Sequence, residues 1–470
     1  MAELWQQSAR ELAALFRSGD ASATEIVTAH LARIDDVNPS VNAVVRRIDE
    51  RALADAAAAD VTRSTRTELG PLAGVPFTIK DNIDLKGDLN THSVDELADF
   101  VPDRDAPVVE RMKAAGAIPL ARTNLPDLGL RIDTDSSLHG RTMNPWDSAR
   151  TPGGSSGGEG AVLATGMSPL GLGNDIGGSL RNPATCCGIS SIKPTFGLVP
   201  HALVGPMGEE TLVEQILAVE GPMARTVADV RMGLAALAGA HPRDPWSVPV
   251  QLESRTGPFR VAVVPDPPGG GTNPDIAALT ARSADWLADA GHRVEIVEPS
   301  LYQDTLDCWT SIVLGGIALD LEATCARVGE NAATVLETSV EAAGELASLE
   351  AFEQAWTERH LLIQRWNEFY SSWDAMVTPT WTQLPFVRGL DLAPGGAERV
   401  LQIVRPVLPA NVMGSPSVAV PGGVIDDVPV GLLVNGPAWS DVTCLSLAEA
   451  IEERNESLAT PIDPRSSKND

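Results

Sequence analysis

The stretch PGGSSGGEG at residues 152–160 is followed, after one short segment, by GNDIGGSLRNP at residues 173–183. In the first stretch, four glycines surround Ser155 and Ser156. Glycine permits positive φ angles and a close approach of ligand to backbone, and turned-in amides present their N–H groups. The two stretches therefore predict tightly shaped loops with exposed backbone donors, which the rest of the fold must hold in place.

The segments on either side of these loops alternate between the patterns of strands and helices. Short apolar runs bounded by turn residues are typical of buried strands, and apolar residues at three- and four-residue spacing are typical of helices. The strands are expected at residues 70–80, 118–122, 261–264 and 294–297, and the helices at 108–117, 276–290 and 319–370. This alternation predicts an α/β fold, with a twisted mixed sheet flanked by helices on both faces.

The chain shows no internal repeat, no low-complexity linker and no clear shift in composition, so we expect one large domain spanning residues 1–470. Residues 1–65 are expected to form an N-terminal helical segment, and residues 70–225 contain the motifs. The polar tail at residues 463–470 is expected to be mobile.

Composition excludes several classes of function. The 470 residues carry 35 basic and 63 acidic side chains, a net charge of −28, which repels nucleic-acid backbones and anionic membranes. No secretory leader and no membrane span is recognisable, so a cytoplasmic protein is expected. The five cysteines are odd in number and lack CxxC spacing, so neither a disulfide framework nor a zinc site is expected. No metal or other cofactor is indicated.

Two familiar uses of glycine-rich loops do not fit. A phosphate-binding P-loop needs the pattern GxxxxGK[ST], and no lysine follows either glycine cluster at that spacing. Residues 153–157 match the GxSxG nucleophile elbow of α/β-hydrolases, which would make Ser155 the nucleophile and require a late histidine. The last of the seven histidines is His360, so that base is missing.

A serine without a histidine needs another base, and a lysine that burial keeps neutral can serve. Lys80 ends the apolar run of residues 70–80, at the kind of strand end where α/β enzymes place their chemistry. A lone lysine at such a position is more often a solvated charge. The motifs around it favour the catalytic interpretation.

These motifs resemble the signature of the amidase-signature family. The matching stretches are GVPFTIKDNID at 74–84, PGGSSGGEGAVLATG at 152–166 and GNDIGGSLRNPA at 173–184. Weaker likeness continues at 192–197, 221–225, 378–380 and 416–423, and residues 240–375 are the least similar part. Three separated motifs in the same order are a far more specific signal than any one of them.

The resemblance implies a serine hydrolase that acts through an acyl-enzyme. Ser179 would attack the carbonyl carbon, Ser155, preceded by a cis peptide bond, would relay the proton, and neutral Lys80 would receive it. The backbone amides of the turn around the nucleophile would form the oxyanion hole. These amides belong to Ile176, Gly177, Gly178 and Ser179.

The resemblance also suggests supporting residues. Asp175 and Arg181 flank the nucleophile where the family places scaffolding groups, although a surface ion pair is the alternative. Gly129 and the residues up to Asp135 are candidates for the substrate pocket. Asn174 stands where threonine is usual, and residues 87–91 also depart from the common pattern.

Substrate choice is less defined. The similarity implies small amides or carbamates (urethanes), with possible esterase activity, and Asn174, Cys186 and Cys187 are similar to members that act on nylon oligomers or urethanes. The segment 201–214 could cover the site with Leu203, Met207, Gly208 and Leu212. Trp309 and its neighbours could line the leaving-group side of the site, but core is the favoured interpretation, because apolar residues at helical spacing are more often core than pocket. These neighbours are Ile312, Val313 and Leu314, together with Val400, Ile403 and Val404.

Two alternatives remain open. The chain could be the A-type component of a tRNA-dependent amidotransferase, which its net charge of −28 disfavours. It could also be a catalytically silent scaffold, although the fold alone would not require Lys80, Ser155 and Ser179. The expected partners are a small-molecule substrate and, at most, a second copy in a homodimer, with no nucleic acid and no membrane.

Overall fold

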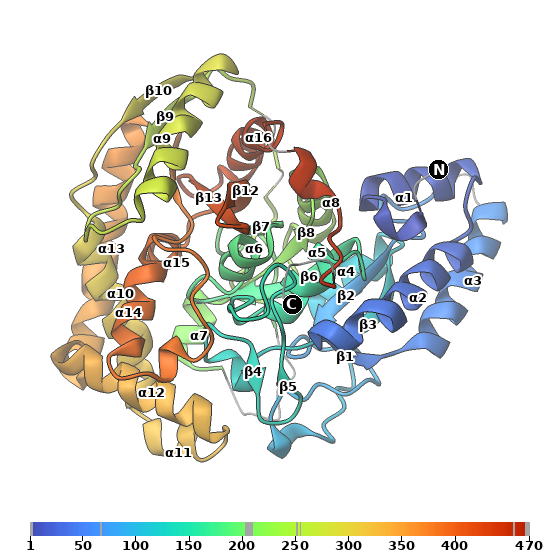
Figure 1. The fold of residues 1–470 in the computed structure, drawn as a ribbon, viewed down its shortest axis with the longest axis horizontal. Coiled ribbons are helices and arrows are strands. Elements are labelled where there is room, and N and C mark those ends of the chain that lie inside the picture. Colours follow the sequence, from blue (N-terminus) through green and yellow to red (C-terminus); the bar gives the residue numbers. More distant parts are fainter. Residues whose placement is uncertain are drawn as a thin grey trace.

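A mixed β-sheet forms the centre of the protein (Figure 1). The computed structural model describes residues 3–65, 68–202, 210–250, 252–253, 255–454 and 456–465. The sheet strands within these residues are β1 (Val44–Arg47), β2 (Pro76–Lys80), β3 (Ile118–Thr123), β6 (Leu170–Asp175), β7 (Ser190–Lys193), β8 (Val219–Ala224), β9 (Arg260–Val263), β10 (Arg293–Ile296), β11 (Ala375–Pro379), β12 (Ser417–Ile425) and β13 (Val428–Asn435). They pair in the order β1-β3-β2-β6-β8-β7-β12-β13-β11-β9-β10. A separate two-stranded sheet contains β4 (Asp135–Ser136) and β5 (Gly140–Arg141).

Helices cover both faces of the sheet. Their bounds are α1 (Ala9–Ser18), α2 (Ala23–Val41), α3 (Asp49–Thr65), α4 (Pro107–Ala114), α5 (Gly157–Ala164), α6 (Arg181–Cys187), α7 (Leu212–Leu217), α8 (Val227–Leu237), α9 (Pro274–Asp289), α10 (Tyr302–Ala318), α11 (Leu321–Cys325), α12 (Glu330–Ala343), α13 (Leu349–Ser372), α14 (Gly396–Val404), α15 (Leu408–Met413) and α16 (Asp441–Glu452). Helices α1, α4, α8, α16 and α9 form one contiguous layer, and α5 and α6 pack against the other face. The predicted single α/β domain with helices on both faces is confirmed.

Alternating residues of the central strands divide the core into two parts. Val418 and Val420 of β12 belong to the cluster beneath the α4, α8 and α16 layer, whereas Ala419 between them packs with α5, α6, α10 and α14. Successive side chains of a strand point to opposite faces, so a sheet buried on both sides needs this apolar run. Such a sheet holds the ends of its strands rigidly.

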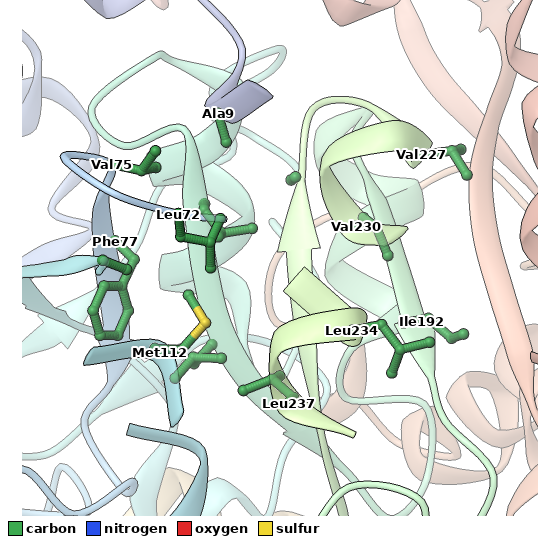
Figure 2. Packing of buried hydrophobic residues seen from close by; sticks show 14 of the residues in the cluster. Ala9, Leu72, Val75, Phe77, Met112, Ile192, Val227, Val230, Leu234 and Leu237 are labelled. Atoms are coloured by element: carbon green, nitrogen blue, oxygen red, sulfur yellow. The ribbon is translucent and has the colours of Figure 1, made fainter. Parts of the chain in front are cut away.

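Helix α8 illustrates how sequence spacing builds the first layer. Thr226 caps the helix by accepting a hydrogen bond from the Asp229 N–H, and apolar residues recur three and four positions apart along its inner face. In Figure 2, Leu237 of α8 lies close to Met112 of α4, and Leu234 lies toward Ile192 of β7. Each fully buried aliphatic side chain of this kind contributes about 1.5–3 kcal/mol.

The predicted elements occur with shifted bounds. The run at residues 70–80 forms a strand only from Pro76, because residues 71–74 make a turn. The region 319–370 contains α11, α12 and α13 with breaks between them. Residues 466–470 of the predicted mobile tail lie outside the described residues, while Arg465 is ion-paired to Asp36 at 2.8 Å. Within the described chain, no helix combines the length and the hydropathy that a membrane crossing would require.

Candidate active site

Lys80 lies at the carboxyl end of β2, in the middle of one half of the sheet. Strand β2 runs parallel to both of its neighbours, β3 and β6, so the ends of all three strands meet at one edge. The Lys80 side chain is fully buried there. Its Nζ lies 2.7 Å from Ser155 Oγ and 2.6 Å from Asn174 Oδ1. The structure thus brings the predicted lysine and serine into direct contact.

The loop before α5 holds Ser155 against Lys80, and the Gly154–Ser155 peptide bond is cis. Close packing leaves no room for a side chain at the two positions that precede Ser155. Gly153 has φ +79°, and a Cβ atom there would lie 2.7 Å from Pro183 Cα. A Cβ atom on Gly154 would lie 2.7 Å from the Arg131 carbonyl oxygen. These contacts explain why the sequence carries glycine at both positions.

Ser179 lies in the turn between β6 and α6. Its backbone carbonyl accepts a hydrogen bond of 3.2 Å from the Ser156 N–H, which connects this turn to the Ser155 loop. Ser179 is partly exposed, and it lines the same cavity as Ser155 and Asn174. The three residues proposed for catalysis therefore come from two loops and one strand end that the sheet brings together.

Asp175 and Arg181 hold the turn that contains Ser179 from beneath. Both are buried, so the alternative of a surface ion pair is wrong. Arg181 Nη2 lies 2.8 Å from Asp175 Oδ1, and Arg181 Nε lies 3.0 Å from Oδ2. Burial alone would raise the pKa of Asp175, but the charge and hydrogen bonds of Arg181 and the hydrogen bond from Asn411 lower it below its usual range.

The same carboxylate shapes the predicted oxyanion hole. The Gly178 N–H donates a hydrogen bond of 2.8 Å to Asp175 Oδ1. This amide is engaged, which leaves those of Ile176, Gly177 and Ser179 as the candidate donors. On the other side, Trp309 Nε1 donates to the Ile176 carbonyl at 3.1 Å. The turn is therefore fixed from two directions.

Removing the Arg181 charge should destabilise the fold. We expect Arg181→Met to lower the free energy of unfolding by about 3–5 kcal/mol, because it leaves the Asp175 carboxylate buried without its partner. Urea unfolding followed by circular dichroism measures this loss. The matched control is Arg365→Met, whose ion pair with Asp304 is exposed and should contribute at most about 1 kcal/mol. Equal losses in the two variants would contradict the scaffolding role.

Burial prepares Lys80 to act as a base. Removal from water disfavours the ammonium form and lowers the pKa of Lys80 to about 7, although the carboxylates of Asp175, Glu159 and Glu220 oppose the shift. Near neutral pH a large fraction of the side chain is therefore the neutral amine. Such an amine can accept a proton from Ser155, which an ordinary surface lysine cannot do.

A large cavity of about 1740 Å³ opens onto Ser155 and Ser179. Gly129 lies at its inner end, where a Cβ atom would come within 3.3 Å of Ser155 Oγ. Helices α10, α12 and α14 contribute a large part of the apolar wall. The apolar lining includes Ile132, Trp309, Val313, Leu314, Leu336, Val400 and Val404.

The cavity corrects one interpretation of the sequence. Trp309, Val313, Leu314, Val400 and Val404 are buried or partly buried and also line the cavity, so the less favoured interpretation, pocket lining, holds for these five. A Cβ atom on Gly177 would lie 2.8 Å from Trp309 Cζ2, which places the indole directly against the turn of the nucleophile. Helical spacing could not reveal this contact, because it joins segments that are far apart in the sequence.

Sequence reasoning also missed the polar contacts of Lys80. Asn174 accepts from Lys80, and its Nδ2 donates to Asn82 Oδ1 at 3.0 Å. Two signals were present: Asn174 departs from the usual threonine, and Asn82 lies two residues after Lys80 within the first motif. Neither signal alone shows that the side chains meet.

The predicted covering segment 201–214 is described only in part. Leu203, Met207 and Gly208 lie outside the described residues, which exclude 203–209. Leu212 begins α7, is half exposed and lines the cavity. Among the residues that the structure describes, no group of three His, Cys, Asp or Glu side chains is arranged to hold a metal ion.

The chain resembles known proteins over most of its length, including the residues of the candidate site. The sequence profile of the family "Amidase" matches residues 25–445. Indoleacetamide hydrolase of Bradyrhizobium diazoefficiens is 38% identical over 97% of this chain and 88% of its own. The A-type component of the glutamyl-tRNA(Gln) amidotransferase of Salinispora arenicola is 32% identical over 96% and 98% of the two chains. The solved structure of 6-aminohexanoate cyclic dimer hydrolase superposes with a TM-score of 0.84 at 31% identity, over 98% of this chain and 99% of that one.

Proposed function

Because the chain belongs to the amidase family of amide hydrolases, we propose that it cleaves small amides by acyl transfer to Ser179, with Ser155 and Lys80 moving the proton. The observation that supports this most directly is the buried contact of 2.7 Å between Lys80 Nζ and Ser155 Oγ. A serine hydroxyl is a weak nucleophile until a base accepts its proton. Ser155 lies at the cavity that also contains Ser179, so it can carry that proton to the lysine.

The proposed steps balance in atoms and charge. Ser179 Oγ forms a bond to the carbonyl carbon, and the carbonyl π electrons move to oxygen. The Ser179 proton passes to Ser155 Oγ while Ser155 gives its own proton to Lys80 Nζ. Collapse of the tetrahedral intermediate breaks the C–N bond, and the leaving nitrogen takes the proton back through Ser155. Water then repeats the sequence on the acyl-enzyme and releases a carboxylic acid.

Backbone amides of the nucleophile turn would stabilise the negative oxygen of both intermediates. The candidates are the N–H groups of Ile176, Gly177 and Ser179, since that of Gly178 is engaged by Asp175. A strong donor of this kind contributes about 3–4 kcal/mol to transition-state stabilisation. The buried pair of Asp175 and Arg181 would keep the turn in place during the reaction.

We propose amides with an apolar acyl group, arylacetamides among them, as the main substrates. The apolar wall of the cavity supports this, as does the 38% identity to a protein named indoleacetamide hydrolase. Carbamates and esters present the same carbonyl to Ser179, so urethanase and esterase activities are proposed as secondary ones. The reaction requires no metal or other cofactor.

A matched substrate panel tests the proposal. An arylacetamide, an N-aryl acetamide, an aryl carbamate and an aryl ester are compared with the wild type and with Ser179→Ala. Ser156→Ala is the control, because this serine is buried in the neighbouring loop and its hydroxyl contacts neither Lys80 nor Ser155 among the described residues. We expect turnover of the amides by the wild type and the control only. Turnover of esters alone would refute amide hydrolysis.

The amidotransferase alternative has its own discriminating measurement. The 32% identity to the A-type component of such an enzyme keeps it testable, whereas the net charge of −28 opposes binding to tRNA. A component of that kind would release ammonia from glutamine when its partner chains are present. The silent-scaffold alternative predicts that no substrate in the panel is turned over.

The pH dependence should follow the neutral form of Lys80. Because burial lowers its pKa to about 7, the ammonium form dominates below that value and cannot accept a proton. We expect kcat/KM to rise about tenfold per pH unit below about 7 and to level above it. The measurement uses a slow amide with a solvent isotope effect that shows proton transfer to limit the rate. A flat profile from about pH 5.5 to 9 would contradict the lysine base.

A further inference from the structure

Asn174 contacts the proposed base, although the mechanism above gives it no role. It lies near the end of β6, beside Asp175, and its Oδ1 accepts a hydrogen bond of 2.6 Å from Lys80 Nζ. Its Nδ2 donates to Asn82 Oδ1 at 3.0 Å. The second bond fixes the orientation of the Asn174 amide, because a flipped amide would present a donor to Lys80.

The valence of a neutral amine makes this contact important. A neutral lysine has two N–H groups and one lone pair, arranged as a tetrahedron around Nζ. Within the described residues, Nζ meets Ser155 Oγ at 2.7 Å and Asn174 Oδ1. Asn174 Oδ1 can only accept, so it must receive an N–H. The lone pair is then free to accept the proton of Ser155.

We propose that Asn174 is the positioning residue of Lys80, whose carbonyl oxygen holds one N–H of the amine so that the lone pair points to Ser155. This inference rests on the proposed function, in which Lys80 accepts the proton. In this role Asn174 acts through the lysine, although its side chain also borders the cavity that contains Ser179. Asn82 supports it by holding the amide in the accepting orientation.

A neutral acceptor suits this place better than a carboxylate. The charged groups that act on Lys80 are Asp175 on β6, Glu159 on α5 and Glu220 on β8. The charge of Lys80 in turn helps to lower the pKa of the buried His92, in the segment after β2. In their ionised forms these three acids favour the ammonium form, against the effect of burial, although burial raises the pKa of Glu159 to about 8 and also raises that of Glu220. A fourth carboxylate in direct contact would stabilise the ammonium further and remove the lone pair at neutral pH. The Asn174 amide supplies an acceptor without adding charge.

A fluorophosphonate probe tests the inference without knowledge of the physiological substrate. The probe reacts covalently with an activated serine, so its second-order rate constant reports the nucleophilicity of Ser179. The rate constant is measured from about pH 5 to 10 for the wild type and for Asn174→Asp, Asn174→Leu and Asn174→Thr. Asn174→Thr is the conservative control, because its hydroxyl can still accept a hydrogen bond. Circular dichroism and thermal melting show that each variant is folded.

The Asn174 variants should change the pH profile of labelling in different ways, and these differences distinguish a positioning role from a structural one. The acidic limb is the part of the pH profile in which the rate constant rises with pH. Asn174→Asp should shift this limb to higher pH by about 1–3 pH units, because the carboxylate favours the ammonium form of Lys80. Asn174→Leu should lower the plateau about tenfold or more without moving the limb upward, because it removes the acceptor. Asn174→Thr should remain closer to the wild type than Asn174→Leu in both quantities. A merely structural residue would leave the limb of Asn174→Asp unmoved, and the threonine hydroxyl of Asn174→Thr would not restore the rate lost in Asn174→Leu.

Defined results would overturn the inference. An unmoved limb in a folded Asn174→Asp variant, or an Asn174→Leu variant as fast as the wild type, would show that the lysine is oriented by other means. If Asn174→Asp does not fold, the comparison of Asn174→Leu with Asn174→Thr decides. Failure of the wild type to be labelled at Ser179 would instead refute the proposed function, so the two failures are distinguishable.

Discussion

Ser179→Ala is expected to lower kcat for the best amide of the panel by about 10⁶-fold, the loss seen when a serine hydrolase loses its nucleophile. Alanine removes the oxygen that bonds to the carbonyl carbon but keeps the backbone N–H of the oxyanion hole. The KM should change little, since the cavity walls are untouched. Initial rates with purified protein, followed by chromatography of the acid product, measure the loss.

The matched control for this variant is again Ser156→Ala. Its backbone N–H, which donates to the Ser179 carbonyl, is unaffected by the substitution. This control should retain most of the activity and so show that loss of a buried hydroxyl near the site is not enough. Activity of Ser179→Ala within about tenfold of the wild type would exclude Ser179 as the nucleophile, given the size of the expected loss.

Lys80→Met is expected to reduce kcat/KM by about 10²–10⁴-fold, the usual contribution of a general base. Methionine fills a similar volume at the buried end of β2 but offers no lone pair basic enough to take the Ser155 proton. The residual rate should also lose its dependence on a group with a pKa of about 7. Rates measured across the pH range show both effects in one experiment.

A second buried lysine provides the control. Burial also lowers the pKa of Lys193 to about 7, but its Nζ donates to the Pro194 carbonyl at 2.9 Å and lies outside the cavity lining. Lys193→Met should therefore keep most of the activity and the pH profile. If both lysine variants lost activity equally, the loss would reflect damage to the fold, and the special role of Lys80 would be contradicted.

The positions of the candidate catalytic residues were predictable because their signals are local, whereas the roles proposed for them came from the family resemblance. Ser155 and Ser179 lie in glycine-rich stretches whose composition reports their own backbone geometry, and Lys80 ends an apolar strand. Parallel strands place their carboxyl ends at one edge, so β2 and β6 bring Lys80 close to the turn of Ser179. The order of the motifs along the chain and the topology of the strands therefore both place Lys80 near the turn of Ser179.

The surroundings of these residues were not predictable in the same way. The Trp309 indole meets the nucleophile turn only because α10 packs against that turn. Its spacing in the sequence is that of any core residue, and in the structure it belongs to both core and cavity. The contact of Asn174 with Lys80 likewise depends on which way one side chain turns at the end of β6. Such contacts follow from tertiary packing, which residue periodicity does not specify.

Of these features, substrate choice depends least on any single segment of the sequence. The cavity wall combines residues from the η3 helix (Asp127–Gly129), α7, α10, α12 and α14, which are widely separated along the chain. The apolar character of the wall could be read only after these elements were assembled. The sequence motifs indicate the bond to be cleaved, and the apolar wall that the helices form supports the proposal of an apolar acyl group.

The most direct test of the central claim is to identify the acylated residue. The wild type is mixed with an excess of a slowly deacylated aryl ester or amide, quenched in acid, and analysed by mass spectrometry of the intact protein and of its peptides. The account predicts one acyl adduct per chain, located on Ser179 and absent from Ser179→Ala. An adduct on Ser155, or product formation without any adduct on Ser179 during rapid turnover, would contradict it.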